Sequence, residues 1–118
     1  MEVTTDAETR ILDLIKIAAE ERIPYSTASL RALREFLEAI TFEKRPSIYL
    51  LENGNFRAIF RNDKNEQLSL QFRADNTIHC VTMMRLDGPH GPLTAHTCVC
   101  SFKSVVFMAS SWLKQRLV

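Results

Sequence analysis

The chain has 118 residues and a formal net charge of +1 at neutral pH, and 46% of its residues are hydrophobic and 25% charged. A chain of this length can bury a core without disulfides or a metal, so we expect one domain over residues 1–118. The small net charge argues against a large basic surface for DNA. No signal peptide and no apolar run of membrane-spanning length is evident, and the sequence therefore predicts a soluble cytoplasmic protein without membrane association.

Charge and cysteine content refine this picture. Residues 1–44 carry six Lys/Arg and nine Asp/Glu (net −3), whereas residues 45–118 carry nine and five (net +4). The positive part suits an acidic partner. The odd number of cysteines (Cys80, Cys98 and Cys100) indicates a reducing compartment.

Two amphipathic helices are predicted in residues 1–44. Thr4-Thr5-Asp6 offers an N-cap for the first helix, and Ile23-Pro24 ends it. The second helix begins near Ser26-Thr27 or Ser29, and its predicted buried stripe comprises Leu30, Leu33, Phe36, Leu37 and Ile40. A proline-containing turn joins the two into a helical hairpin, which must pack on another apolar surface.

The period of the apolar residues changes from helix to strand at Pro46. Asn53-Gly54 between two apolar runs predicts a β-hairpin with a two-residue turn. Such a turn would set two cross-strand pairs, Leu51 with Phe56 and Tyr49 with Ala58.

Two further strands follow with clean alternation. Parity places Phe60 beside Leu68 and predicts a three-residue turn over residues 63–65, in which Asn65 tolerates a positive φ. Asp75-Asn76 then turns the chain into a fourth strand over 77–86. That strand is apolar on both faces, which indicates cover on both sides or contact with a partner.

A loop over residues 87–92 precedes a short fifth strand (93–100) and a last helix (101–118), for which Ser101 or Ser104 can be the N-cap. This order of elements indicates an α+β fold. We expect an N-terminal helical hairpin (1–44), an antiparallel four- to five-stranded meander (45–100) and a C-terminal helix packed on one sheet face. The other face stays open to solvent or to a partner.

The segment from Pro46 to Asp63, PSIYLLENGNFRAIFRND, resembles a hairpin of small, mostly uncharacterised bacterial proteins. Their pattern is PS-x-x-LL-x-NGN-x-RA-x-W-x-N, followed by LQF (here Leu70-Gln71-Phe72) and a last amphipathic helix. Phe60 stands where the pattern has tryptophan. The resemblance covers residues 46–84 well and the rest only in pattern. It implies a bacterial origin, and it implies an antitoxin-like role because such proteins look like members of plasmid- or island-borne gene pairs.

The stretch HTCVC raises the question of a metal or thiol site. In a strand, His96, Cys98 and Cys100 share one face, with about 6.5–7 Å between successive same-face positions. This spacing is wide for three ligands of one zinc ion, and the tighter Cys-x-x-Cys knuckle is absent. We therefore predict a buried strand face with no metal and no cofactor. The alternatives are a thiol- or zinc-dependent protein that uses His96, Cys98 and Cys100, and a catalytic pair of Cys100 with His96 or His90.

Polar residues line the sheet face opposite the phenylalanines. The candidate partner-binding residues are Arg57, Arg61, Gln71, Arg73 and His79. Arginines on neighbouring strands suit phosphate or an acidic protein surface. RNA-binding sheets expose aromatic side chains on this face, so we do not expect nucleic acid as a direct ligand. The sequence shows no catalytic constellation, and it predicts a non-enzymatic module that binds a protein partner or forms a homodimer.

Overall fold

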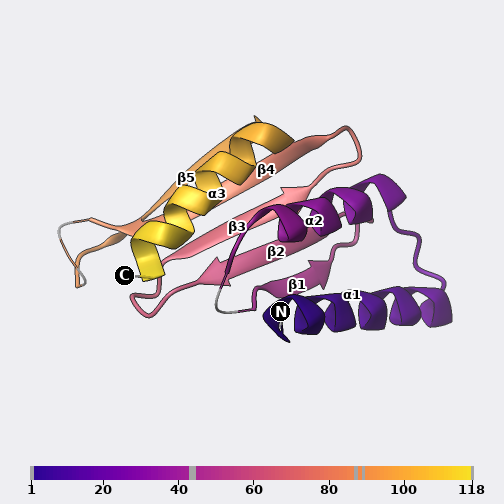
Figure 1. Ribbon diagram of the computed structural model, residues 1–118. Helices are drawn as coiled ribbons and strands as arrows, with labels where there is room; N and C mark the ends of the chain where they lie inside the picture. Colours follow the sequence, from indigo (N-terminus) through magenta and orange to yellow (C-terminus); the bar gives the residue numbers. More distant parts are fainter. Residues whose placement is uncertain (1, 43–44, 87, 89, 118) are drawn as a thin grey trace.

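The molecule is an antiparallel sheet with its helices at the two ends of the chain (Figure 1). The computed structural model describes residues 2–42, 45–86, 88 and 90–117. Two helices come first, α1 (Glu2–Glu21) and α2 (Thr27–Ala39), and α3 (Phe102–Leu117) comes last. Between them lie β1 (Ser47–Leu50), β2 (Phe56–Arg61), β3 (Gln67–Phe72), β4 (Thr77–Arg85) and β5 (Leu93–Ser101). The strands neighbour one another in chain order, and the predicted α+β fold is confirmed.

The helices divide the sheet between them. In Figure 1, α2 lies over β2 and β3, α3 lies over β4 and β5, and α1 runs beside β1 at the edge of the sheet. The core forms where α2 meets the central strands. There the ring of Phe36 lies 5.5 Å from that of Phe72 and 6.1 Å from that of Phe60. One continuous cluster of buried apolar side chains includes residues of all three helices and of β1 to β4.

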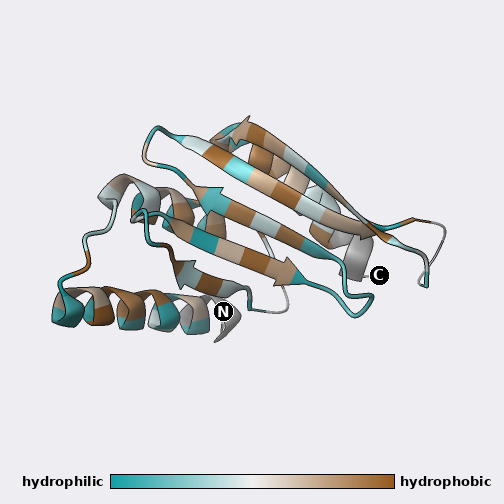
Figure 2. Ribbon diagram, turned by 180° about the vertical axis from the view of Figure 1, so that it is seen from behind, coloured by the Kyte–Doolittle hydropathy of each residue, from teal (hydrophilic) through white to brown (hydrophobic). Residues whose placement is uncertain are grey.

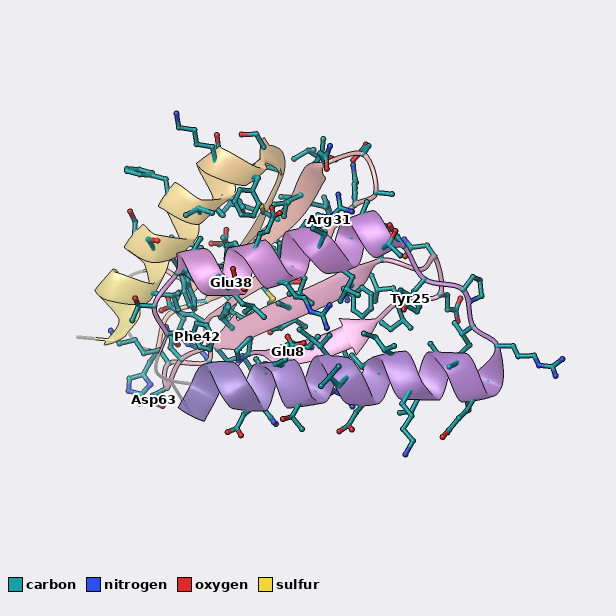
Figure 3. All side chains as sticks on the ribbon, turned by 45° about the vertical axis from the view of Figure 1, so that its right-hand side comes forward. Glu8, Tyr25, Arg31, Glu38, Phe42 and Asp63 are labelled. Carbon is teal, nitrogen blue, oxygen red and sulfur yellow. The ribbon has the colours of Figure 1, made fainter. Side chains whose placement is uncertain are left out.

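Polar contacts fix the two N-terminal helices. Arg34 of α2 forms an ion pair with Glu8 of α1, with 2.6 Å between Nη2 and Oε1, and Figure 3 shows Glu8 on the side of α1 that faces α2. Ser29 of α2 is fully buried. Its hydroxyl donates to the carbonyl oxygen of Phe72 and accepts from the amide of Phe56, at 2.8 Å. Because Phe56 and Phe72 face each other across β2 and β3, this hydroxyl fastens α2 to both strands.

The first hairpin differs from the predicted one. Leu50 pairs with Phe56 and Tyr49 with Arg57, one residue away from the predicted register. The turn has three residues, 52–54, closed by hydrogen bonds of 2.9 Å between Leu51 N and Asn55 O and between Gly54 N and Leu51 O. Gly54 has φ +88°, which suits the left-handed position of such a three-residue turn. Its carbonyl also accepts from Ser26 N at 2.8 Å, so the turn is built to contact the start of α2.

The other turns follow the sequence. Phe60 faces Leu68 as predicted, and Asn65 has φ +62° in the turn between β2 and β3. Ser26 is the N-cap of α2, at the first of the two predicted starts, and Ser101 is the N-cap of α3, the first of its two predicted caps. Their hydroxyls accept from the amides of Ser29 and Ser104, respectively. The predicted cap of α1 at Thr4-Thr5-Asp6 is wrong, since the helix already begins at Glu2. The predicted end of the last helix, residue 118, lies outside the described residues.

Candidate functional site

The sheet face opposite α2 and α3 is the first candidate site, and Figure 2 views it directly. One row of side chains crosses this face from edge to edge, because Tyr49 faces Arg57, Arg57 faces Gln71, Gln71 faces His79 and His79 faces Val99. Antiparallel neighbours in register point to the same side of a sheet. The structure therefore brings three of the predicted binding residues, Arg57, Gln71 and His79, into one row.

The other two predicted residues lie at opposite ends of this face. Arg61 ends β2 opposite Gln67, whereas Arg73 follows β3 at the turn to β4. The arginine and histidine side chains thus form a spread-out basic surface and not a compact anion pocket. We call this side of the sheet, with Arg57, Arg61, Gln71, Arg73 and His79, the open face.

Apolar side chains complete the open face. Tyr49 is 41% exposed and Val99 54% exposed at its two edges. Val81 and Met83 of β4 are half-buried between them. The shifted hairpin register explains why the sequence analysis missed Tyr49, since the predicted pairing with Ala58 placed its ring in the core. The surface is therefore a mixed aromatic, aliphatic and basic one.

The strands contribute positive but no negative side chains to the open face. None of the five strands contains an Asp or Glu residue. Arg61 donates to the hydroxyl of Ser47 at 3.4 Å, and Arg85 donates to the carbonyl oxygens of Lys64 and Gly91 at 2.7 and 2.8 Å. No hydrogen bond or ion pair joins Arg57 to another residue in the described part of the chain. The strands thus place arginines but no carboxylate on this face, and Asp75 lies near Arg73 in the turn to β4.

A second candidate site lies on the helix side of β4 and β5. Cys80 faces Cys98 across these strands, and Cys100 is two residues further along β5. The three Sγ atoms all lie within 4.8 Å of one another, and those of Cys98 and Cys100 are 3.3 Å apart. His96 shares this face but does not belong to the group of sulfur atoms. The set brought together is therefore Cys80, Cys98 and Cys100, in which Cys80 takes the place that His96 has in the alternative thiol or zinc site.

The prediction of a buried strand face is only partly correct. His96, Cys98 and Cys100 do share one side of β5, but His96 and Cys98 are exposed and Cys100 is half-buried. The physical reason is that β5 is an edge strand, so its side chains lack a neighbouring strand on one flank. Cys80 in the inner strand β4 is fully buried.

Burial works against activation of Cys80 and Cys98 as nucleophiles. Burial raises the pKa of the Cys80 thiol above its ordinary value, and the neighbouring thiols Cys100 and Cys98 raise it further. Burial also raises the pKa of Cys98, with a smaller contribution from its hydrogen bond with Cys100. A catalytic cysteine requires a lowered pKa. Among the described residues no hydrogen bond joins a histidine to a cysteine, and the geometry gives no support to a Cys–His catalytic pair.

Two further features lie outside these two candidate sites. The buried carboxylate of Glu66 accepts from Asn62 Nδ2 at 3.0 Å and from the amide of Arg85 at 2.9 Å, and it connects the turn between β2 and β3 to the end of β4.

A shallow apolar hollow of about 420 Å³ lies between the end of α1 and the end of β1. Its lining includes Leu14, Ile17, Ile23 and Leu50, with Glu21 and Glu52 among the polar residues.

Comparison with known proteins adds no relative. No protein-family model matches the chain, and no curated protein or solved structure matches it. Over the described residues, no helix combines the length and the apolar character needed to cross a bilayer. Function must therefore be argued from the two sites themselves.

Proposed function

We propose that this protein is a non-enzymatic binding module whose open face docks on an acidic surface of another protein. The observation that carries the proposal is the composition of that face. It presents arginines beside exposed Tyr49 and Val99, it contains no carboxylate on any strand, and α2 and α3 cover only the other side of the sheet. Protein interfaces are enriched in Arg and aromatic residues, and complementary charge guides the partners together.

The charge of the open face favours a partner different from the protein itself. Two copies stacked through this face would bring arginines toward arginines, and like charges across an interface are unfavourable. Nucleic acid fits less well, because sheets that bind single strands stack bases on several aromatic rings. The rings in the strands on this face are those of Tyr49, at the edge strand β1, and of His79 in β4, and they lie at different places along the row. An antitoxin-like protein would be one case of such a module, with the acidic surface belonging to a toxin encoded beside it.

The test combines affinity capture with mapping of the contact. The wild-type protein, the double variant Arg57→Glu/Arg73→Glu and the control Arg31→Glu serve as baits. Arg31 is an exposed arginine of α2, away from the open face (Figure 3). The control therefore makes the same arginine-to-glutamate change at a position outside the proposed interface. We expect acidic proteins to be retained by the wild type and by the control, and to be lost by the double variant.

A captured protein counts only after purification and a nuclear magnetic resonance titration. Amide shifts centred on Arg57, Gln71 and His79 would support the proposal. Shifts confined to the helix side, or equal binding by the double variant, would refute it. Light scattering and a titration with polyuridylate test the other ligands in the same samples. A concentration-independent dimer that buries the open face, or tight polyuridylate binding there, would replace an acidic protein by a second copy or by RNA and so overturn the proposal.

A further inference from the structure

The three cysteines form a site that is independent of the open face. Cys80 and His79 are consecutive in β4, so their side chains point to opposite sides of the sheet, and the thiols lie on the side that carries α3. Cys80 is buried at the base of the group, whereas Cys98 is exposed at the edge strand. A thiophilic ion could reach the group from solvent without any movement of the helices.

The distances between the sulfur atoms fit a shared metal ion. A Zn–S bond of about 2.3 Å implies about 3.8 Å between two sulfur ligands in a tetrahedron. The observed separations run from 3.3 Å for Cys98 and Cys100 to at most 4.8 Å within the group, so they bracket this value.

Packing alone does not account for this arrangement. A free cysteine often behaves as a small buried hydrophobic residue, which explains Cys80. It does not explain why the exposed Cys98 lies against two other thiols. Successive same-face positions of a strand are about 6.6 Å apart, yet the Sγ atoms of Cys98 and Cys100 approach to 3.3 Å because their side chains lean toward each other.

A disulfide between Cys98 and Cys100 is geometrically unfavourable. The Cβ atoms of a disulfide lie about 3.5–4.5 Å apart, whereas same-face Cβ atoms along a strand repeat at about 6.6 Å. Oxidation of this pair would therefore require a change in the backbone of β5. The same two thiols can hold a metal ion without such a change, because each metal–sulfur bond lengthens the bridge between them.

We propose that Cys80, Cys98 and Cys100 bind one thiophilic d¹⁰ metal ion, Zn²⁺ or Cu⁺, with any fourth position directed to solvent. Thiolate ligands select these ions over harder cations. Three thiolates suit trigonal Cu⁺ directly, and they suit Zn²⁺ with a water or an exogenous ligand in the fourth place. Each thiol gives up its proton to solvent as its metal–sulfur bond forms.

The experiment uses the whole reduced protein in a thiol-free phosphine reductant. Binding of Zn²⁺ and of Cu⁺ is measured separately by competition with chromophoric chelators, and stoichiometry is measured by native mass spectrometry. Co²⁺ serves as a spectroscopic probe, because thiolate-to-cobalt charge-transfer absorption reports sulfur ligands directly. We expect one ion per chain in at least one of the two arms, and native mass spectrometry of the protein purified without added metal identifies the ion.

Serine variants and one control locate the ligands. Cys98→Ser changes an exposed residue and should fold normally, and we expect it to weaken binding by more than about 100-fold, since the loss of a residue that merely supports a ligand already weakens binding about 10–100-fold. Cys80→Ser and Cys100→Ser should act alike, with circular dichroism confirming the fold. His96→Ala is the matched control on the same strand face, and it should bind as the wild type does.

Three results would overturn the proposal. The first is a reduced wild-type protein that binds neither ion more tightly than micromolar. The second is unchanged binding and charge-transfer absorption in Cys98→Ser. The third is a loss in His96→Ala as large as that in Cys98→Ser, which would replace the three-cysteine set by one that includes the histidine.

Discussion

Replacement of Ser29 by alanine tests how α2 is held on the sheet. The Ser29 hydroxyl is buried, and it is bonded both to the amide of Phe56 and to the carbonyl oxygen of Phe72. Alanine at this position would leave two buried backbone groups without these partners. Each such group destabilises a protein by about 1–3 kcal/mol. Because the strands can relax toward each other, we expect the free energy of unfolding to fall by about 2–4 kcal/mol, a large part of the 5–15 kcal/mol typical of a domain.

The assay is urea unfolding followed by circular dichroism, in which a lower midpoint with an unchanged slope reports lost stability. Thr27→Ala in the same helix is the control, because Thr27 is exposed, and its effect should stay within about 0.5 kcal/mol. A Ser29→Ala protein that is as stable as the control would show that the hydroxyl does not fasten the helix. The reasoning about the contact between α2 and the two strands would then be wrong.

Two other predictions concern turns. Gly54→Ala should lower the free energy of unfolding by about 1–2 kcal/mol, because φ at this position is +88° and a Cβ atom there is sterically disfavoured; an unchanged urea midpoint would contradict the turn geometry. The pKa of Asp75 is held below its ordinary value by the hydroxyl of Thr77, then by the amide of Thr77 and by nearby Arg73. A lowered pKa in the folded state means a contribution to stability that is present above the unfolded pKa and is lost as pH falls through the folded pKa. Thr77→Val should therefore raise the pKa of Asp75 toward its ordinary value in a carboxyl ¹³C titration, whereas Thr97→Val on β5 should leave it unchanged.

The sequence predicts the central hairpin correctly because two independent signals agree. Alternation in β2 and β3 fixes which residues face the core, and Asn65 marks the residue of the turn that takes a positive φ. The first hairpin offers only the turn signal. Asn-Gly fits both a two-residue and a three-residue turn, and the choice depends on the contact of Gly54 with Ser26, a residue outside the hairpin. The local sequence contains no information about such a tertiary contact. The predicted register therefore put Tyr49 on the core face, whereas the structure has it on the open face.

The spacing of residues along one strand was also not enough to predict the group of three thiols. The interval between Cys98 and Cys100 speaks against a shared ion, but the third ligand comes from the neighbouring strand. Cys80 joins the group because β4 and β5 pair in a register in which Cys80 faces Cys98. The sequence between the two strands contains two prolines and two glycines, and its length does not determine this pairing. The side chains of Cys98 and Cys100 also lean along the strand, which a count of residues cannot show.

The open face and the thiol group lie on opposite faces of the same strands, so the two proposals can be tested separately. The row that crosses the open face includes His79 and Val99. His79 precedes Cys80 in the sequence, and Val99 lies between Cys98 and Cys100. Because consecutive strand residues point to opposite sides, a charge reversal at Arg57 leaves the sulfur atoms untouched, and Cys98→Ser leaves the arginines untouched. Each variant should therefore abolish one binding activity and preserve the other. A variant that loses both would indicate that β4 and β5 had been disturbed as a whole, and circular dichroism of that variant would decide the matter before any site was reassigned.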